Sequence, residues 1–287
     1  MESTSNKEAS TKASLNPKNF LTASEEIRKI EKDLPPLFSL WNFRRSAFYV
    51  NMFYPHHAIF IDSPLQYLNQ SRLVLHITYL LRAWFFLARK GFKIDILKLE
   101  GKDQHNIDVI THNLWENFNL FQFSRGRIER MVYLLRLAPA KRNGKTLCVG
   151  PKNEGELLLF RRNGFTNVIG IDLFSYCPSI LPMDVAHMTF ANDTFDTINC
   201  GSMLQYVEDL EQVAREIVRV AKPDALVTFS LTIPQPGDHS PYVGDLRAGD
   251  TESTLALFGA NVKHVYFRND VDHLPGHKHE VVFQIKK

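Results

Sequence analysis

The sequence predicts an α/β protein, in which a mostly parallel sheet has helices on both faces and follows a mainly helical N-terminal region. From about residue 124 onward, short apolar runs that suit buried strands alternate with amphipathic stretches of helix length. Before that point the chain is rich in aromatic residues and has few glycines, which favours helices. Hydrophobic residues make up 44% and charged residues 23% of the 287 residues, which excludes a mainly disordered or fibrous chain.

This change of pattern divides the chain into three regions. We expect a disordered tail over residues 1–18, a mainly helical module over 19–123 and a sheet domain over 124–287. The tail is polar and lacks the apolar stretch of a signal peptide. The module is too apolar for a free linker, so we expect it to serve as a substrate lid or as the surface of a homodimer.

The N-terminal module contains two strongly predicted helices. They cover residues 25–34 and 73–89, whereas residues 48–61 also suit a strand. The apolar part of the second helix is shorter than the roughly 20 residues that span a bilayer, and His76 and Arg82 interrupt it. We therefore expect a buried or amphipathic helix and no membrane span, with weak attachment to a membrane surface as the alternative.

The sheet domain has a regular order of elements. Its predicted helices cover residues 127–137, 154–163, 207–221 and 251–258. Its predicted strands cover residues 145–149, 167–171, 180–183, 195–200, 225–231, 262–267 and 280–285. Because no helix separates the last two strands, we expect the final strand to be antiparallel and to lie at one edge of the sheet.

Composition limits the partners, metals and compartment. The net charge of +3 gives no reason to expect a nucleic-acid partner. Three cysteines without a CxxC pair indicate neither a disulfide framework nor a zinc site, so we expect no metal and a reduced, cytoplasmic compartment. His273, His277 and His279 lie in a polar connection, where we expect exposure to solvent rather than metal binding.

The candidate site lies where strands end. Open α/β sheets bind ligands beyond the carboxyl ends of their strands, close to where the strand order reverses. Gly150 and Gly155 flank the turn after the first strand, and Asp172 ends the second strand 22 positions after Gly150. A carboxylate there can accept hydrogen bonds from ribose hydroxyls, with a helix cap or turn as the alternative. Asp184, after the third strand, is placed to accept a hydrogen bond from an adenine amino group.

Six sequence pieces occur in a characteristic order between residues 145 and 232. They are Val149-Gly150, the strand ending in Asp172, Met183-Asp184 followed by His187–Phe190, Asp193–Ile198, Ser202–Val207 and Ala214–Pro223. Their order and spacing resemble the class I S-adenosylmethionine-dependent methyltransferases, a group with a Rossmann-like seven-stranded sheet. The resemblance covers residues 124–287 and implies S-adenosylmethionine as the cofactor. The turn lacks GxGxxG, which argues against a nicotinamide-dependent dehydrogenase.

The resemblance also implies which residues contact the cofactor. The implied contacts are Gly150, Pro151, Glu154 and Gly155 for the methionine part, Asp172 and Leu173 for ribose and adenine, Asp184 and Val185 for the adenine edge, and Cys200, Gly201 and Ser202 for the floor beneath the methyl sulfonium. No residue is assigned as a catalytic base. The candidates by position are His187, Tyr206 and His239.

The turn departs from the family pattern. Family members commonly carry an acidic residue where Cys148 stands and glycines where Lys152 and Glu154 stand. We expect Glu154, with Glu156 as the alternative, to replace the missing carboxylate opposite the cofactor's ammonium. The rival interpretation makes Glu154 a favourable charge at a helix N-terminus.

These observations favour one function and leave others open. We expect a methyltransferase that acts on a small-molecule or glycan-type acceptor. The altered turn leaves open a non-catalytic relative that binds the cofactor or a partner. The basic stretch over residues 124–145 leaves open a methyltransferase acting on RNA or protein, although arginines on the solvent face of a helix also explain it.

Overall fold

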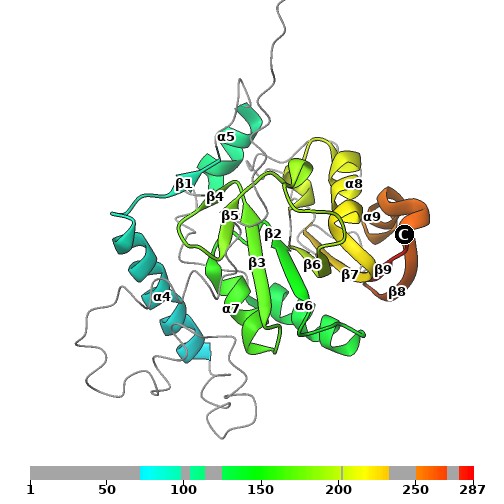
Figure 1. The fold of residues 1–287 in the computed structure, drawn as a ribbon, viewed down its shortest axis with the longest axis horizontal. Coiled ribbons are helices and arrows are strands. Elements are labelled where there is room, and N and C mark those ends of the chain that lie inside the picture. The colour runs from blue at the N-terminus through cyan, green and yellow to red at the C-terminus, as the bar shows by residue number, and fades with distance from the viewer. Residues whose placement is uncertain (1–71, 98–103, 114–124, 202, 233–249, 270–277) are drawn as a thin grey trace, which may run out of the picture.

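A computed structural model describes residues 72–97, 104–113, 125–201, 203–232, 250–269 and 278–287. The helix expected over residues 25–34 and the ambiguous stretch over 48–61 lie outside these ranges. Within them the chain forms an α/β domain with a seven-stranded sheet, as the sequence predicts (Figure 1).

The sheet has the order β5-β3-β2-β6-β7-β9-β8. Its strands are β2 (Lys145–Val149), β3 (Asn167–Asp172), β5 (Ile180–Pro182), β6 (Phe195–Gly201), β7 (Ala221–Thr232), β8 (Val262–Asn269) and β9 (Lys278–Ile285). The first five pair in parallel, and β9 pairs antiparallel with both β7 and β8. The strand order reverses between β2 and β6, so their carboxyl ends mark the expected ligand crevice.

Helices cover both faces of the sheet. The described α-helices are α4 (Arg72–Arg89), α5 (Gln104–Thr111), α6 (Arg125–Leu137), α7 (Glu154–Arg162), α8 (Leu210–Val220) and α9 (Thr251–Phe258). Short 3-10 helices η7 (Val185–His187), η8 (Leu204–Tyr206) and η9 (Gly259–Asn261) complete the connections. One layer contains α7 with α4 and α6, each of which contacts α7, and the other contains α8 and α9 (Figure 1).

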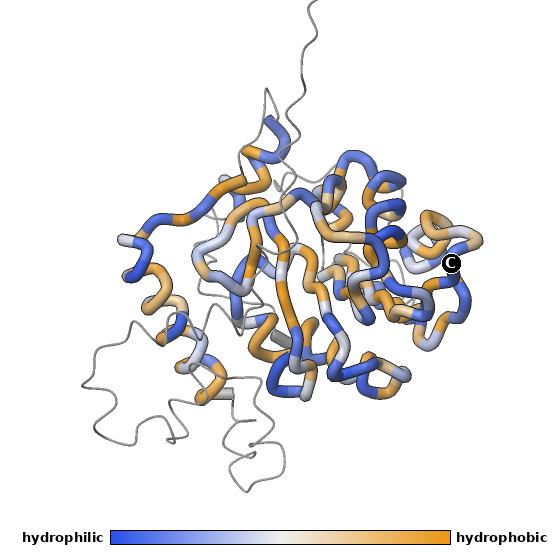
Figure 2. Tube along the Cα trace, viewed as in Figure 1, coloured by the Kyte–Doolittle hydropathy of each residue, from blue (hydrophilic) through white to orange (hydrophobic). Residues whose placement is uncertain are grey.

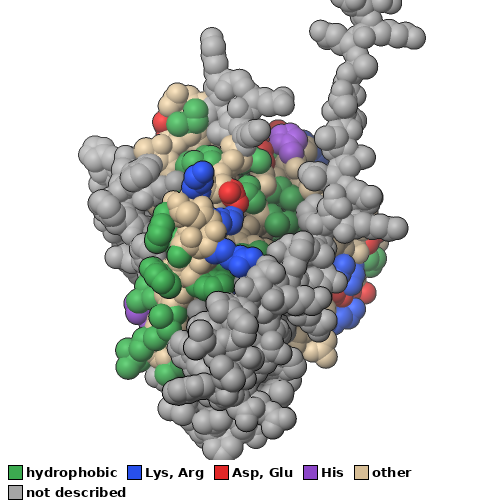
Figure 3. Space-filling view, turned by 60° about the vertical axis from the view of Figure 1, so that its left-hand side comes forward, with side chains coloured by type: hydrophobic (Ala, Val, Ile, Leu, Met, Phe, Trp, Pro, Cys, Tyr) green, Lys and Arg blue, Asp and Glu red, His purple; other side chains and the backbone are tan. Residues whose placement is uncertain are grey.

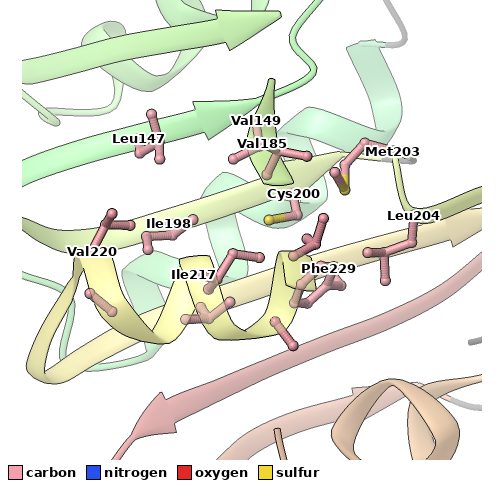
Figure 4. Close-up of a cluster of buried hydrophobic side chains, with 14 of the residues drawn as sticks. Leu147, Val149, Val185, Ile198, Cys200, Met203, Leu204, Ile217, Val220 and Phe229 are labelled. Carbon is pink, nitrogen blue, oxygen red and sulfur yellow. The ribbon is translucent and has the colours of Figure 1, made fainter. Parts of the chain in front are cut away.

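Two hydrophobic cores separate the sheet from its helices. Successive strand residues point to opposite faces, so Leu147 and Val149 enter the core under α8, whereas Cys148 enters the core under α7. Figure 2 shows hydrophobic residues concentrated along the central strands, and Figure 4 shows Ile217 and Val220 of α8 packed over the sheet. The central strands read as nearly continuous apolar runs because both of their faces are buried.

The end of the sheet differs from the prediction in one respect. The final strand β9 is antiparallel, as expected, but it lies between β7 and β8 rather than at the edge. Val281, Val282 and Phe283 of β9 are fully buried, whereas β8 alternates exposed and partly buried residues. The more apolar strand therefore takes the interior position and β8 forms the edge.

The described part of the region before the sheet domain, residues 72–97 and 104–113, contacts the sheet domain through α4, β1 and α5. Helix α4 packs on α7, and the two-residue strand β1 (Asp95–Ile96) pairs with β4 (Phe174–Ser175) directly after β3. From α5, the Nε2 atom of His105 lies 2.7 Å from the carbonyl oxygen of Tyr206 in η8. On α4, the side chains of Leu73, Ile77 and Trp84 are exposed. Figure 3 shows hydrophobic side chains at the surface on this side of the molecule.

Candidate cofactor site

The turn after β2 brings the backbone close to the segment after β6. Gly150 has a φ of 66°, and its amide donates to the carbonyl of Ile171 at 2.9 Å. A Cβ atom at Gly150 would lie 3.1 Å from the Cβ of Met203, which leaves little room for a side chain. The glycine is therefore required both for the left-handed backbone and for the close approach of this turn to the segment after β6.

Asp172 lies at the tip of β3, where the sequence places it. Its Oδ2 accepts a hydrogen bond from the Lys152 amide and its Oδ1 accepts one from the Leu173 amide, both at 2.8 Å. The side chain is partly buried, and this burial raises the pKa of Asp172 to about 6, against the lowering effect of the backbone amides of Lys152, Leu173 and Phe174. A carboxylate has about four lone-pair positions, so the two amides at 2.8 Å do not use all of its capacity to accept hydrogen bonds from neighbouring hydroxyls. This geometry fits a ribose diol.

Lys152 holds the turn in a conformation that suits glycine better. Its φ is 60°, although it carries a side chain. The following residue, Asn153, caps α7 by accepting a hydrogen bond from the Gly155 amide at 3.0 Å. The Lys152 amide thus donates to Asp172, and the next residue caps α7. The conformation of the turn and the position of the Asp172 carboxylate therefore depend on each other.

Glu154 has a different partner from the one that the sequence suggests. Its side chain is fully buried, and Arg82 of α4 binds both of its oxygens, at 2.8 Å and 2.5 Å. Burial alone would raise the pKa of Glu154, but Arg82, Arg161 and Ser179 together hold it below its ordinary value. The carboxylate is therefore charged and engaged inside the protein, not open toward a cofactor ammonium.

Glu156, the alternative carboxylate, is also internal. It is 1% exposed and accepts a hydrogen bond from the Asn199 side chain at 2.8 Å, while Asn199 in turn accepts one from Thr228 at 2.7 Å. Cys148 is fully buried as well, so no carboxylate stands at the position that the family fills with an acidic residue.

The remaining predicted contacts fall into two groups. Asp184 caps η7 by accepting a hydrogen bond from the Ala186 amide at 2.9 Å, and His187 lies 3.0 Å from its other oxygen. The side chains of Val185 and Cys200 point into the core under α8, as Figure 4 shows, so they offer a cofactor only their backbone. Pro151 and Leu173 follow the carboxyl ends of β2 and β3, and Gly201 is the last residue of β6, whereas Ser202 lies outside the described residues.

The histidine expectations have mixed outcomes. His279 is 1% exposed, which contradicts the expected exposure, because it lies on β9 in the interior of the sheet. His239, His273 and His277 lie outside the described residues.

In the described part of the chain, no group of His, Cys, Asp and Glu is arranged to hold a metal ion. None of the described helices is long and apolar enough to cross a membrane.

Two residues at the site escape the sequence interpretation. In the sequence, Arg82 only interrupts an apolar helix. A single cation in such a helix indicates that a carboxylate partner is buried with it. His105 lies in a short polar helix without a motif, and no pattern connects it with Tyr206, 101 positions later.

Comparison with known proteins gives a family for part of the chain. Residues 147–229 match the family model of a methyltransferase domain. No curated protein matches the sequence.

Several solved structures are similar in fold at low sequence identity. The N-methyltransferase NodS from Bradyrhizobium japonicum in complex with S-adenosyl-L-homocysteine is 13% identical, with a TM-score of 0.46 over 64% of this chain and 97% of that one. The PH0226 protein from Pyrococcus horikoshii is 18% identical, with a TM-score of 0.44 over 65% of this chain and 100% of that one.

The family match and the sheet agree on one assignment. The matched residues run from β2 into β7 and include the glycine turn and Asp172. The seven-stranded sheet around them has the architecture that the resemblance implies. Residues 147–229 therefore resemble a methyltransferase domain in sequence and lie in the seven-stranded sheet that the resemblance implies.

Proposed function

We propose that the chain transfers the methyl group of S-adenosylmethionine to a small-molecule or glycan-type acceptor, with the cofactor at the carboxyl ends of β2, β3 and β6. The cofactor supplies an activated methyl group, and the protein aligns the acceptor with it. We propose that Asp172 binds the ribose and that Leu173 and Asp184 lie along the adenine. Gly150, Pro151, Gly155 and the backbone of Val185, Cys200, Gly201 and Ser202 complete the proposed contacts.

The observation that carries the cofactor position is the arrangement of Asp172. Its two oxygens each accept one backbone amide and keep lone pairs for a diol. The turn that supplies one of these amides also contains Gly150, which lies close to Met203 after β6. Glu154 is left out of the proposed contacts because Arg82 occupies its carboxylate.

The acceptor class is supported by what surrounds this edge of the sheet. The segment after β3 is covered by β1, and η8 is contacted by His105 of α5. Both contacts come from the N-terminal region and lie at the end of the sheet where transfer would occur (Figure 1). An edge bordered by the chain's own segments suits a small acceptor better than the broad surface of an RNA or a protein.

The altered turn supports a second candidate, a relative that binds the cofactor without catalysis. Among the described residues, both turn carboxylates, Glu154 and Glu156, are engaged internally. In this candidate the domain binds S-adenosylmethionine weakly through the nucleoside alone.

The test uses methyl-labelled S-adenosylmethionine and the full-length protein. A cell extract is separated into small-molecule, glycan, RNA and protein fractions, and each is incubated with the protein and with an Asp172→Ala control. We expect label in the small-molecule or glycan fraction, and none with the control. Label in RNA or protein would contradict the acceptor class. Cofactor binding without label in any fraction would favour the non-catalytic candidate.

A further inference from the structure

The one charged side chain between the ends of helix α4 points into the protein. Between its terminal residues the helix carries one charged side chain, Arg82, which is 1% exposed. The opposite face carries exposed Leu73, Ile77 and Trp84 (Figure 3). Burying a guanidinium is costly unless a partner compensates it, so this orientation requires a specific contact.

That contact is a two-point ion pair with the start of α7. The Nε of Arg82 lies 2.8 Å from Oε2 of Glu154, and its Nη2 lies 2.5 Å from Oε1. The hydroxyl of Ser179 donates to Oε1 at 2.9 Å, and the Nη1 of Arg161 lies 3.6 Å from the same oxygen. Arg82 therefore contacts both oxygens of Glu154, whereas Ser179 and Arg161 contact only Oε1.

Glu154 is connected to the proposed ribose carboxylate through the backbone. It is the first residue of α7, and its amide donates to the hydroxyl of Tyr176 at 3.0 Å. Two positions earlier, Lys152 has a φ of 60° and donates its amide to Asp172. Such a conformation is unfavourable for a residue with a side chain and persists where the surroundings fix it.

We propose that Arg82 is a positioning residue of the cofactor site, which holds Glu154 so that the turn presents the Lys152 amide to Asp172. The proposal rests on the proposed function of Asp172 as the ribose ligand. It extends the cofactor site to α4, which lies outside the residues 147–229 that match the family.

Removal of Arg82 has a defined structural consequence. Glu154 would keep only Ser179 and Arg161 as partners, and its carboxylate would be drawn toward Arg161. The first turn of α7 would move with Glu154, and the residues before the helix, including Lys152, would shift as well. The loss should therefore be felt at the nucleoside end of the cofactor, through Asp172, rather than at its amino-acid end.

Two ligands distinguish this positioning role from a direct one. S-Adenosyl-L-homocysteine carries both the nucleoside and the amino acid, whereas 5′-methylthioadenosine carries the nucleoside without the amino acid. Both are titrated by calorimetry into the full-length protein and into Arg82→Met, with Leu75→Ala as the matched control. Leu75 is 2% exposed on the same helix, so its truncation destabilises the packing of α4 without touching Glu154.

We expect Arg82→Met to weaken both ligands by the same factor, about tenfold or 1.4 kcal/mol. Leu75→Ala should lower the melting temperature and leave both affinities within about twofold of the wild type. Equal behaviour of the two variants would overturn the proposal. A loss confined to S-adenosyl-L-homocysteine would also overturn it, because it would place the effect at the amino-acid end.

A conservative variant covers the case in which Arg82→Met fails to fold. Arg82→Lys keeps the charge but lacks the fork that binds two oxygens, so we expect a several-fold loss for both ligands. Wild-type affinity in a folded Arg82→Lys would overturn the positioning role. If the wild-type protein binds neither ligand, the proposed function itself fails, which is a different result from wild-type binding that is insensitive to Arg82.

Discussion

Replacement of Asp172 by alanine tests the proposed ribose contact. Each oxygen of Asp172 accepts one backbone amide at 2.8 Å and has a further lone pair for one hydroxyl. Two hydrogen bonds to a charged acceptor contribute roughly 1.5–3 kcal/mol each, so their loss amounts to roughly 3–6 kcal/mol. The dissociation constant of S-adenosyl-L-homocysteine should therefore rise by about 10²- to 10⁴-fold.

The assay is calorimetric titration of the full-length protein at neutral pH. Asp224→Asn is the matched control, because Asp224 is an exposed carboxylate at the opposite end of the strands with a φ of 66°, which asparagine tolerates. The control should bind like the wild type. An affinity that Asp172→Ala leaves unchanged would refute the assignment of Asp172.

Three further predictions follow from the same contacts. Because the pKa of Asp172 is raised to about 6, the affinity for S-adenosyl-L-homocysteine should be constant between about pH 7 and 8 and should fall up to about tenfold per unit below about pH 6. The raised pKa also means that the Asp172 carboxyl stabilises the folded state at low pH and that this contribution is lost as pH rises toward 6. An affinity for S-adenosyl-L-homocysteine that does not change with pH would contradict the role of Asp172 in ribose binding. Glu154→Gln should lower the free energy of unfolding in denaturant titration by about 3–5 kcal/mol, because it leaves buried Arg82 without a counter-charge, whereas a loss of only about 0.3–1 kcal/mol would indicate the helix-end role instead. Gly150→Ala should cost about 1–2 kcal/mol of stability and weaken cofactor binding, since the backbone is left-handed and the new Cβ would crowd Met203; wild-type melting and affinity would contradict this.

The central strands were predictable because their pattern is unambiguous. Residues 145–149 form β2 as predicted, and β3 and β6 extend only one residue beyond the predicted ends. Buried parallel strands are apolar on both faces, and such runs stand out between polar turns. The position of Asp172 follows from the same regularity, since it depends only on where the second strand ends.

The place of the last strand was not predictable in the same way. The sequence gives its type and direction, because no helix precedes it. Either β8 or β9 could pair with β7 in the interior of the sheet. The packing on the two faces of the sheet decides that β9 takes this place. A pattern along one segment does not contain this information.

The partner of Glu154 shows why the site itself was only partly predictable. The sequence interpretation assigned Glu154 to the cofactor's ammonium, but the ion pair of Glu154 is made by Arg82, 72 positions earlier. The lone arginine in an apolar helix was interpreted only as an interruption of that helix, although a buried cation needs a carboxylate partner. Several carboxylates satisfy that need on paper, and only the packing of α4 on α7 selects one.

A crystal structure of the complex with S-adenosyl-L-homocysteine tests the central claim most directly. We expect ribose hydroxyls within hydrogen-bond distance of both oxygens of Asp172, with the amino-acid part of the ligand along the turn at Gly150. It also predicts that Glu154 remains paired with Arg82 in the complex. A nucleoside bound away from Asp172, or an ammonium paired with Glu154 in place of Arg82, would contradict the account.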